Sequence, residues 1–235
     1  MKIALLGYGK MGKLIEETAL RAGMEIGPKL DIDDNPDGSG VTAVSMEGVD
    51  VAIEFSQPEA ALSNITAAAR AGVSIVAGTT GWFDKRAQVE RLVNETGIGL
   101  IYGANFSIGM NLFFEIVDHA SRIVGMIPQY DAFLMEEHHH AKKDAPSGTA
   151  LNLRDLMRPH LNNPDLDIAC IRAGHIPGTH VVGFDGEADT ILLEHRARNR
   201  KGFAEGAVLA ARWIAGKKGI YDFRQVFREI VGLTQ

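Results

Sequence analysis

The chain has 235 residues, of which 46% are hydrophobic and 23% are charged, and its formal net charge is −6 at pH 7. This length can bury one large core or two small ones. An acidic chain offers no electrostatic surface for nucleic acid or an anionic membrane. The single cysteine, Cys170, excludes an intramolecular disulfide and a multi-cysteine metal site.

The N-terminus leads directly into a short apolar strand pattern, without the features of a signal peptide. No apolar stretch approaches the roughly 18–20 residues that are needed to span a bilayer. We therefore expect a soluble, cytoplasmic protein.

A glycine-rich turn follows the first predicted strand, residues 2–6. It reads Gly7-Tyr8-Gly9-Lys10-Met11-Gly12 and leads into a helical pattern, and a second strand, residues 25–30, ends at Asp31. This is G-x-G-x-x-G between a strand and a helix, with an acid about 20 residues further on, which is typical of dinucleotide binding. The first glycine permits the turn, the second lets pyrophosphate approach, and the third lets the helix pack closely. A purely structural glycine turn is the alternative, which the strand, helix and acid disfavour.

Strands and helices alternate as far as residue 102. The predicted strands are residues 49–55, 74–77 and 98–102, and the predicted helices are residues 58–72 and 84–95. The first of these helices is preceded by Ser56-Gln57-Pro58-Glu59, which has a capping-box pattern. Such alternation predicts a Rossmann-type, doubly wound parallel sheet that binds ligands at the carboxyl ends of its strands.

Two further loops follow strand ends in this part of the chain. Gly78-Thr79-Thr80-Gly81 would by itself be interpreted as a flexible turn, and its place at a strand end favours a cofactor contact instead. The segment from Gly103 to Asn111 is either an interdomain linker or a loop beneath the nicotinamide. The residues alone leave both alternatives open.

The pattern changes after residue 111. A helix (112–124), a strand (131–137) and a helix (148–157) precede three consecutive strands (167–173, 179–184 and 189–197), with a hairpin signal at Asp185-Gly186. A helix at 203–215, a break at 216–219 and a helical segment at 221–231 complete the chain. This order predicts a smaller α+β domain with a mixed, partly antiparallel sheet, whose open face needs cover and favours an oligomer.

The loop after the strand at 131–137 carries the densest group of titratable side chains, with three histidines at 138–140 and two lysines at 142–143. Ser147 is a suitable N-cap, so the first-turn amides at Gly148 and Thr149 would form a receptor for a carboxylate. Successive side chains of an extended segment point to opposite faces, so the three histidines cannot converge on one metal ion, and we expect none. The alternatives are a solvated loop and an active site for an acidic small molecule.

The residues from Glu136 to Ala150 read E-x-H-H-x-x-K-x-D-A-P-S-G-T-A, which resembles the signature of the dihydrodipicolinate reductases (4-hydroxy-tetrahydrodipicolinate reductases). The G-T-T-G turn and the A-N-F-S-x-G-x-N segment also resemble motifs of this family, and the resemblance covers nearly the whole chain. It implies NAD(P)H-dependent reduction of 4-hydroxy-tetrahydrodipicolinate to tetrahydrodipicolinate with loss of water, in lysine and diaminopimelate biosynthesis. Hydride would pass to C4 of a cyclic imine dicarboxylate, and a proton to C3.

The resemblance also implies roles for single residues. His138 matches the proposed proton donor or acceptor, which suits the near-neutral pKa of histidine, and Lys142 matches a proposed proton donor. His139, Gly148 and Thr149 match substrate-binding positions. The implied cofactor contacts are Gly7, Tyr8, Gly9, Lys10, Met11, Gly12, Asp31, Gly78, Thr79, Thr80, Gly103, Ala104, Asn105 and Phe106. Arg172, His175, His195 and Arg196 are interpreted as a solvated strand surface.

In the family the chain's end returns to the nucleotide domain. We therefore expect residues 1–106 and 213–235 to form the dinucleotide-binding domain, and residues 107–212 to form the substrate-binding and oligomerisation domain of a homotetramer. The region 159–175 is shorter than in longer members, which affects the loops there rather than the catalytic loop.

The choice of cofactor depends on Asp31, because an acid at this position favours the ribose diol of NADH and repels a 2′-phosphate. The family often has arginine after this acid, where the present chain has Ile32. We therefore predict a preference for NADH; NADPH can also bind if Lys29 or Lys10 compensates.

Two other functions are compatible with parts of the pattern. One is a related Rossmann dehydrogenase that acts on a different amino or imino acid. The other is a nucleotide-sensing module without turnover, which the dense histidine and lysine loop disfavours because binding alone does not need it.

Overall fold

The computed structural model describes residues 1–163 and 165–233. The chain divides into two compact units, unit 1 (Met1–Ile108 and Arg200–Gln235) and unit 2 (Gly109–Asn199). Position 164, within the predicted short region, and positions 234 and 235, at the end of the predicted nucleotide domain, lie outside the described residues. Among those described, no helix combines the length and the apolar character that a bilayer crossing requires.

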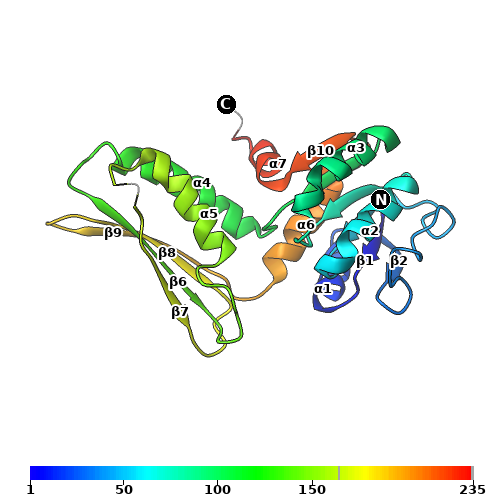
Figure 1. The fold of residues 1–235 in the computed structure, drawn as a ribbon, viewed down its shortest axis with the longest axis horizontal. Coiled ribbons are helices and arrows are strands. Elements are labelled where there is room, and N and C mark those ends of the chain that lie inside the picture. The colour runs from blue at the N-terminus through cyan, green and yellow to red at the C-terminus, as the bar shows by residue number, and fades with distance from the viewer. Residues whose placement is uncertain (164, 234–235) are drawn as a thin grey trace. The chain divides into compact units, whose positions relative to one another are not determined.

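Unit 1 is built on one fully parallel sheet. Its strands are β1 (Lys2–Leu6), β2 (Glu25–Leu30), β3 (Val51–Glu54), β4 (Ser74–Ala77), β5 (Gly99–Tyr102) and β10 (Gly219–Asp222). Its helices are α1 (Lys10–Arg21), α2 (Pro58–Arg70), α3 (Arg86–Thr96), α6 (Lys201–Ile214) and α7 (Phe223–Ile230), with the 3₁₀ turn η1 (Phe83–Lys85). The strand order is β10-β5-β4-β3-β1-β2, with every pair parallel (Figure 1). The predicted doubly wound Rossmann-type sheet is confirmed.

Both faces of this sheet are covered, because successive side chains of a strand point to opposite faces. In β1, Ile3 and Leu5 enter one core with α1, α6 and α7, whereas Ala4 and Leu6 enter a second core with α2 and α3. All four side chains are fully buried. The nearly continuous apolar strands of the sequence therefore reflect burial on two sides, and they leave polar function to the strand ends.

The C-terminal part of unit 1 differs from the prediction in two places. The return to the nucleotide unit was placed at residue 213, but the chain already returns at Arg200, because α6 buries Ala204, Ala207 and Ala211 in the core of unit 1. The predicted break and helix near 216–222 contain a strand instead, since β10 pairs in parallel with β5 from Gly219 to Asp222.

The predicted capping box before α2 is wrong. The N-cap of α2 is Gln57, without a side-chain capping bond, and Pro58 occupies the first turn as expected. The hydroxyl of Ser56 donates instead to the carboxylate of Glu54, at the end of β3. The hydroxyl of Ser56 thus bonds the buried carboxyl group of Glu54 and does not cap the helix.

Unit 2 contains a four-stranded mixed sheet with helices on one face. Its elements are α4 (Ile108–Val124, whose first residue is counted in unit 1), β6 (Asp131–His138), α5 (Gly148–Met157), the 3₁₀ turn η2 (Arg158–His160), β7 (Ile168–Arg172), β8 (Thr179–Asp185) and β9 (Thr190–Arg196). The order is β7-β6-β8-β9; β6 and β7 are parallel, and the other two pairs are antiparallel. This is the predicted mixed sheet. Phe113 of α4, Leu153 of α5, and Leu134 and Val182 of the sheet share its core. Figure 1 shows α4 and α5 on the same face of this sheet.

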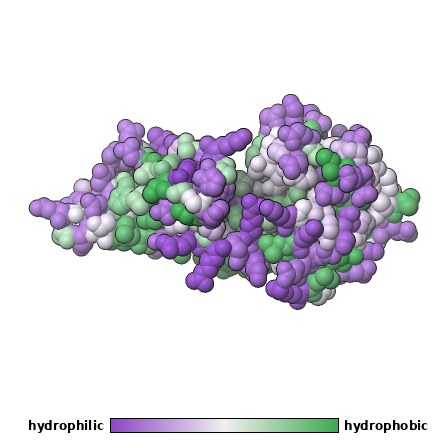
Figure 2. Space-filling model, turned by 90° about the horizontal axis from the view of Figure 1, so that it is seen from below, coloured by the Kyte–Doolittle hydropathy of each residue, from purple (hydrophilic) through white to green (hydrophobic). Residues whose placement is uncertain are grey.

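The other face of this sheet carries apolar side chains that no described helix of unit 2 covers. Ile171 and Leu192 are 45% and 59% exposed. Met135 pairs with Ala169, and Phe133 pairs with Gly183, whose own partner is Leu192, so these residues share that face. Figure 2 shows apolar side chains gathered over this half of the molecule. We call this surface the open sheet face.

Candidate active site

The glycine-rich turn of unit 1 has the geometry that phosphate binding requires. Gly7 has φ +94°, and a Cβ there would overlap the carbonyl of Phe55; a Cβ at Gly12 would overlap the carbonyl of Gly7. At Gly9 a Cβ would meet nothing within 4 Å, and Gly9 is the N-cap of α1 with no side-chain capping bond. Gly7 and Gly12 therefore permit close backbone packing, and Gly9 leaves the N-terminus of α1 open to an anion.

A cavity of about 280 Å³ lies beside this turn, at the carboxyl ends of β1, β2 and β3. Gly7, Gly9, Asp31 and Ile32 line one part of it, and Gln57 and other residues at the start of α2 line another. The cavity lies wholly within unit 1. Its lining combines the phosphate turn with the acid that suits a ribose diol, so it fits the adenosine half of a dinucleotide.

Lys29, which was considered as a compensating cation for NADPH, is engaged elsewhere. Its Nζ lies 3.2 Å from Oε1 of Glu16 and 4.8 Å from the centre of the Tyr8 ring, and the hydroxyl of Tyr8 donates to Glu16. The lysine charge is thus matched by a carboxylate. Lys10 is exposed at the first position of α1.

A buried carboxyl that the sequence analysis did not single out supports the strand ends. Glu54 is fully buried, and its Oε1 accepts from the amide of Ser56 at 3.2 Å and from Nδ2 of Asn64 at 3.5 Å. Its Oε2 has no hydrogen-bond partner among the described residues. Burial raises the pKa of Glu54 despite these bonds.

The G-T-T-G turn is tied to the same network. Oγ1 of Thr79 accepts from the amide of Ser56 at 2.8 Å, and the carbonyl of Thr79 accepts from the indole of Trp82 at 3.0 Å. A Cβ at Gly78 would overlap the ring of Phe55. Thr80 follows directly. The turn is therefore built at the carboxyl end of β4, next to the end of β3.

The segment after β5 is divided between core and surface. Phe106 is 1% exposed, stacks on Phe223 with ring centres 4.4 Å apart and contacts Phe55 edge-on. Its side chain is therefore a core element, and the backbone is what it offers to a ligand. Ala104 is exposed, and Oδ1 of Asn105 accepts from the amide of Ser107 at 2.9 Å.

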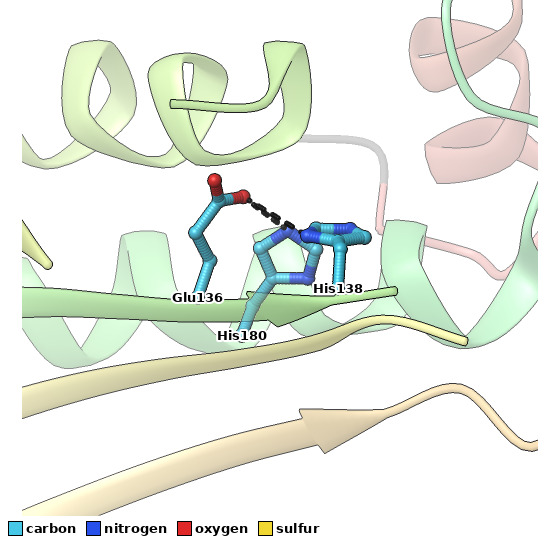
Figure 3. A group of neighbouring side chains, drawn as sticks. All are labelled: Glu136, His138 and His180. Atoms are coloured by element: carbon cyan, nitrogen blue, oxygen red, sulfur yellow. Dashed lines mark ion pairs between the residues drawn. The ribbon is translucent and has the colours of Figure 1, made fainter. Parts of the chain in front are cut away.

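In unit 2, the neighbouring strands β6 and β8 bring a carboxylate and two histidines together. Glu136 and His138 lie two residues apart on β6 and so share a face, and His180 of β8 pairs directly with Glu136. Nδ1 of His138 is 3.4 Å from Oε2 of Glu136, and Nε2 of His180 is 3.7 Å from the same oxygen. Figure 3 shows the three side chains gathered on one side of the sheet. All three are buried.

The other oxygen of Glu136 holds the signature loop. Oε1 accepts from Nη2 of Arg172 at 2.6 Å and from the backbone amide of Ser147 at 2.9 Å. Nη2 of Arg172 also donates to the carbonyl of Asp144 at 2.5 Å. The carboxylate and the guanidinium therefore fasten the loop just before α5.

The start of α5 follows the prediction. Ser147 is the N-cap, and its Oγ accepts from the amide of Ala150 at 3.2 Å and lies 3.4 Å from Nε2 of His180. Gly148 and Thr149 are the first two helical positions, whose amides point out of the helix end. Gly148 is exposed, and a Cβ there would meet nothing within 4 Å.

The cluster is strongly perturbed electrostatically. Burial lowers the pKa of His180 to about 4, and it lowers the pKa of His138 against the opposing effect of Glu136. Burial acts to raise the pKa of Glu136, but its bonds with Ser147 and Arg172 outweigh burial and hold that pKa at about 2. At neutral pH the cluster thus consists of a carboxylate and neutral imidazoles. Such perturbed groups concentrate at functional sites.

The remaining signature residues lie around this cluster. Nζ of Lys142 is 2.8 Å from Oδ1 of Asp144, and this bond lowers the pKa of Asp144. His139 is half-buried just after β6, and Nδ1 of His140 is 2.9 Å from the carbonyl of Gly174. His138 and His140 thus have different partners, Glu136 and Gly174.

The interpretation of Arg172 and His195 as a solvated strand surface is wrong. The side chain of Arg172 is only 17% exposed and is ion-paired with Glu136. His195 pairs with His180 across β8 and β9 and lies against Phe113. His180 was missed altogether, because its partners come from another strand. The two-residue spacing of Glu136 and His138 within a predicted strand indicates that their side chains share a face, and it could have identified this part of the cluster.

Glu136, His138 and His180 are also the group with ligand atoms near enough for a metal ion, within 4.8 Å of one another, in the described part of the chain. Carboxylate and imidazole donors would suit zinc. However, the guanidinium of Arg172 lies 2.6 Å from the same carboxylate, and this fixed positive charge opposes a divalent cation. The charge balance therefore favours a proton relay over a metal centre.

A Rossmann-type nucleotide unit joined to a mixed-sheet unit with a buried histidine cluster defines an oxidoreductase that uses a pyridine nucleotide. The model of the dihydrodipicolinate reductase N-terminus matches residues 1–106, and that of the C-terminus matches residues 109–227. The chain therefore belongs to the dihydrodipicolinate reductase family. It is an NAD(P)H-dependent reductase of lysine and diaminopimelate biosynthesis.

Relatives with this activity resemble the chain over nearly its whole length. The 4-hydroxy-tetrahydrodipicolinate reductase of Christiangramia forsetii is 37% identical over 98% of this chain and 99% of its own. That of Archaeoglobus fulgidus is 34% identical over 94% of this chain and 97% of its own. A dipicolinate-bound dihydrodipicolinate reductase from Paenisporosarcina sp. TG-14 has the same fold, with a TM-score of 0.77 at 22% identity over 96% of this chain and 99% of its own.

Proposed function

We propose that the chain reduces 4-hydroxy-tetrahydrodipicolinate with unit 1 as the nucleotide-binding part and unit 2 as the substrate-binding part. The observation that carries this proposal is the buried histidine His138, which sits over Glu136 beside the N-terminus of α5. A proton-transfer group thus adjoins a receptor for a carboxylate, which a cyclic imine dicarboxylate needs.

Unit 1 would hold the cofactor through the features of its turn. The open N-terminus of α1 at Gly9 suits the pyrophosphate, and Asp31 suits the adenosine ribose. When bound, the reduced nicotinamide supplies the hydride that C4 of the substrate receives. The backbone around Gly78 and Gly103, at the ends of β4 and β5, would position its ring.

Unit 2 would hold the substrate by its two carboxylates. The amides of Gly148 and Thr149 at the helix N-terminus, with the ammonium of Lys142, supply positive charge to them, and His139 is a further polar contact. The relative from Paenisporosarcina sp. TG-14 was solved with dipicolinate, a planar diacid of similar charge. These interactions stabilise the negative charge that develops on the substrate as C4 is reduced.

His138 or Lys142 would then deliver the proton to C3. The pKa of His138 is lowered by burial, so the free site holds a neutral imidazole. The two substrate carboxylates favour the protonated imidazole of His138. Substrate binding would therefore be accompanied by uptake of the proton that the reaction consumes. The ammonium of Lys142 is a second source of a proton.

Absorbance at 340 nm tests this assignment. His138→Gln and Lys142→Ala should each lower kcat by about two orders of magnitude or more, with the Kd for NADH unchanged. His140→Gln, a neighbouring change whose imidazole contacts the Gly174 carbonyl, serves as the control and should keep normal turnover. Near-normal kcat in the His138 or Lys142 variant would refute the role of that residue, and no oxidation of NADH with this substrate would refute the reaction.

A preference for NADH rests on the surroundings of Asp31. The next residue, Ile32, is 68% exposed at the cavity, where it offers an apolar surface and no charge for a 2′-phosphate. The charge of Lys29 is matched by Glu16. We expect kcat/KM to be higher with NADH, and Ile32→Arg should raise kcat/KM with NADPH. Wild-type protein that clearly prefers NADPH would contradict this account.

The open sheet face supports a homotetramer. Exposed Leu192 and Ile171, with Phe133 and Met135, form an apolar surface on strands whose other face is already covered. Leu192→Glu should lower the mass measured by light scattering during gel filtration. Val44→Glu is the control, because Val44 is exposed in unit 1. A monomeric wild-type protein would contradict the assembly.

A further inference from the structure

The buried cluster contains two charged residues to which the proposed reaction assigns no role. Glu136 is fully buried on β6, and Arg172 is largely buried at the end of β7. A buried ion pair is costly to form and adds little to stability compared with apolar residues of the same size. Its presence beside His138 therefore calls for another explanation.

Their contacts join three parts of the proposed site. Through Oε1 of Glu136 and Nη2 of Arg172, the pair bonds the carbonyl of Asp144 and the amide of Ser147, which are the two ends of the segment leading into α5. Through Oε2, Glu136 faces Nδ1 of His138 at 3.4 Å. The carboxylate of Glu136 therefore lies in contact with the loop, with the start of α5 and with His138.

The contact with Nδ1 also determines which nitrogen of His138 is available. Oε2 of Glu136 and Nδ1 of His138 form no hydrogen bond among the described residues, but a buried carboxylate 3.4 Å away still favours the tautomer with its hydrogen on Nδ1. Nε2 is then the nitrogen that exchanges a proton. Nε2 lies on the side of Gly178, where a Cβ would come within 3.1 Å of it. The glycine, with φ +146°, leaves that side open.

We propose that Glu136 and Arg172 are positioning residues for the reduction: the carboxylate of Glu136 faces Nδ1 of His138, and the two residues together fix the carboxylate-binding start of α5. This inference rests on the proposed role of His138. Glu136 acts through the imidazole, and Arg172 acts through Glu136 and the loop; neither needs to touch the substrate.

The two residues have opposite electrostatic effects on His138. The carboxylate of Glu136 favours the protonated imidazole, whereas the guanidinium of Arg172 opposes it. The other charged or titratable groups around the histidines are Lys142 and Asp144 of the loop, His180 of β8 and His195 of β9. Because these groups remain in both variants, removing one member of the pair should shift the alkaline limb of activity, where His138 loses its proton, in a direction set by that member alone.

The pH profile of kcat/KM in Glu136→Gln and Arg172→Gln tests the proposal. In Glu136→Gln the alkaline limb, where the proton donor His138 loses its proton, should move to lower pH by about one unit, and in Arg172→Gln it should move to higher pH. In both, kcat should fall by about ten- to a hundredfold, because the imidazole and the loop lose their alignment, while the Kd for NADH stays unchanged. Asp131→Asn, an exposed change at the far end of β6, is the control and should leave the profile in place.

The outcomes separate this proposal from the proposed function. If His138→Gln is inactive while both pair variants keep the wild-type profile, the positioning role is overturned and the function stands. Shifts in the same direction would also overturn it. If Glu136→Gln does not fold, Arg172→Lys decides. Lysine keeps the positive charge but loses the planar guanidinium that bonds both Glu136 and Asp144, so the KM for the substrate should rise with the alkaline limb unmoved. An unchanged KM would overturn the tethering role.

Discussion

The lowered pKa of His180 makes a quantitative prediction about acid stability. His180 is 6% exposed, with Glu136 and His138 beside it, and its pKa falls from 6.5 to about 4 mainly because burial disfavours the charged form. Between these two values the unfolded chain binds a proton that the folded chain does not. The stability that the neutral imidazole contributes is therefore complete above pH 6.5 and is lost as the pH falls through 4.

The magnitude follows from the two pKa values. The full difference corresponds to about 3 kcal/mol, of which about 2 kcal/mol is already lost at pH 5. This is a large share of the roughly 5–15 kcal/mol that stabilises a typical domain. Glu136, with a pKa of about 2 against its usual 4.5, loses its own contribution only below pH 4.5. The window from pH 5 to 7.5 therefore excludes Glu136, whereas Glu54, whose pKa is raised by burial, titrates equally in the wild type and the variant.

His180→Gln removes this titration and keeps an amide at the same position. We expect the free energy of unfolding, measured by circular dichroism in urea at one fixed protein concentration, to fall by about 2 kcal/mol more in the wild type than in the variant between pH 7.5 and pH 5. His138 and His195 titrate in both chains, and their contributions largely cancel in the difference. Parallel pH profiles for the two proteins would refute the reasoning.

Three further predictions concern single residues. Gly178→Ala should cost about 1–3 kcal/mol of stability and lower kcat, because its Cβ would press on His138. Gly174→Ala in the same loop, where a Cβ meets nothing within 4 Å, should keep kcat. Steady-state kinetics and urea unfolding compare the two variants. Gly9→Ala should lower the unfolding midpoint only slightly, because alanine is a poorer N-cap than glycine, but it should weaken NADH binding in a fluorescence titration. Equal affinity would argue against pyrophosphate at this turn. Glu54→Gln should gain stability relative to the wild type as the pH rises above 4.5, because burial raises the pKa of this carboxyl and the proton it holds is lost at higher pH; a constant difference in urea melts from pH 4.5 to 8 would contradict this.

Local patterns in the sequence were sufficient for most of the fold. Residues 3–6 and 51–53 are apolar on both faces, and the glycine turn, the proline at 58 and the serine at 147 mark helix starts that depend only on nearby residues. The strand β10 was not predictable in this way. Its four residues have no strong pattern, and they become a strand because β5 offers an unpaired edge beside them.

The candidate site shows the same division. The sequence by itself determined the phosphate turn and the signature loop, because glycine spacing, an N-cap and neighbouring histidines are local properties of the chain. Only the tertiary structure decided that Glu136 meets His180, that Arg172 reaches the loop at Asp144, and that Gly178 leaves room for His138. These contacts depend on the register between strands that are distant in sequence, and register is set by how the whole sheet packs against α4 and α5, which no local pattern encodes.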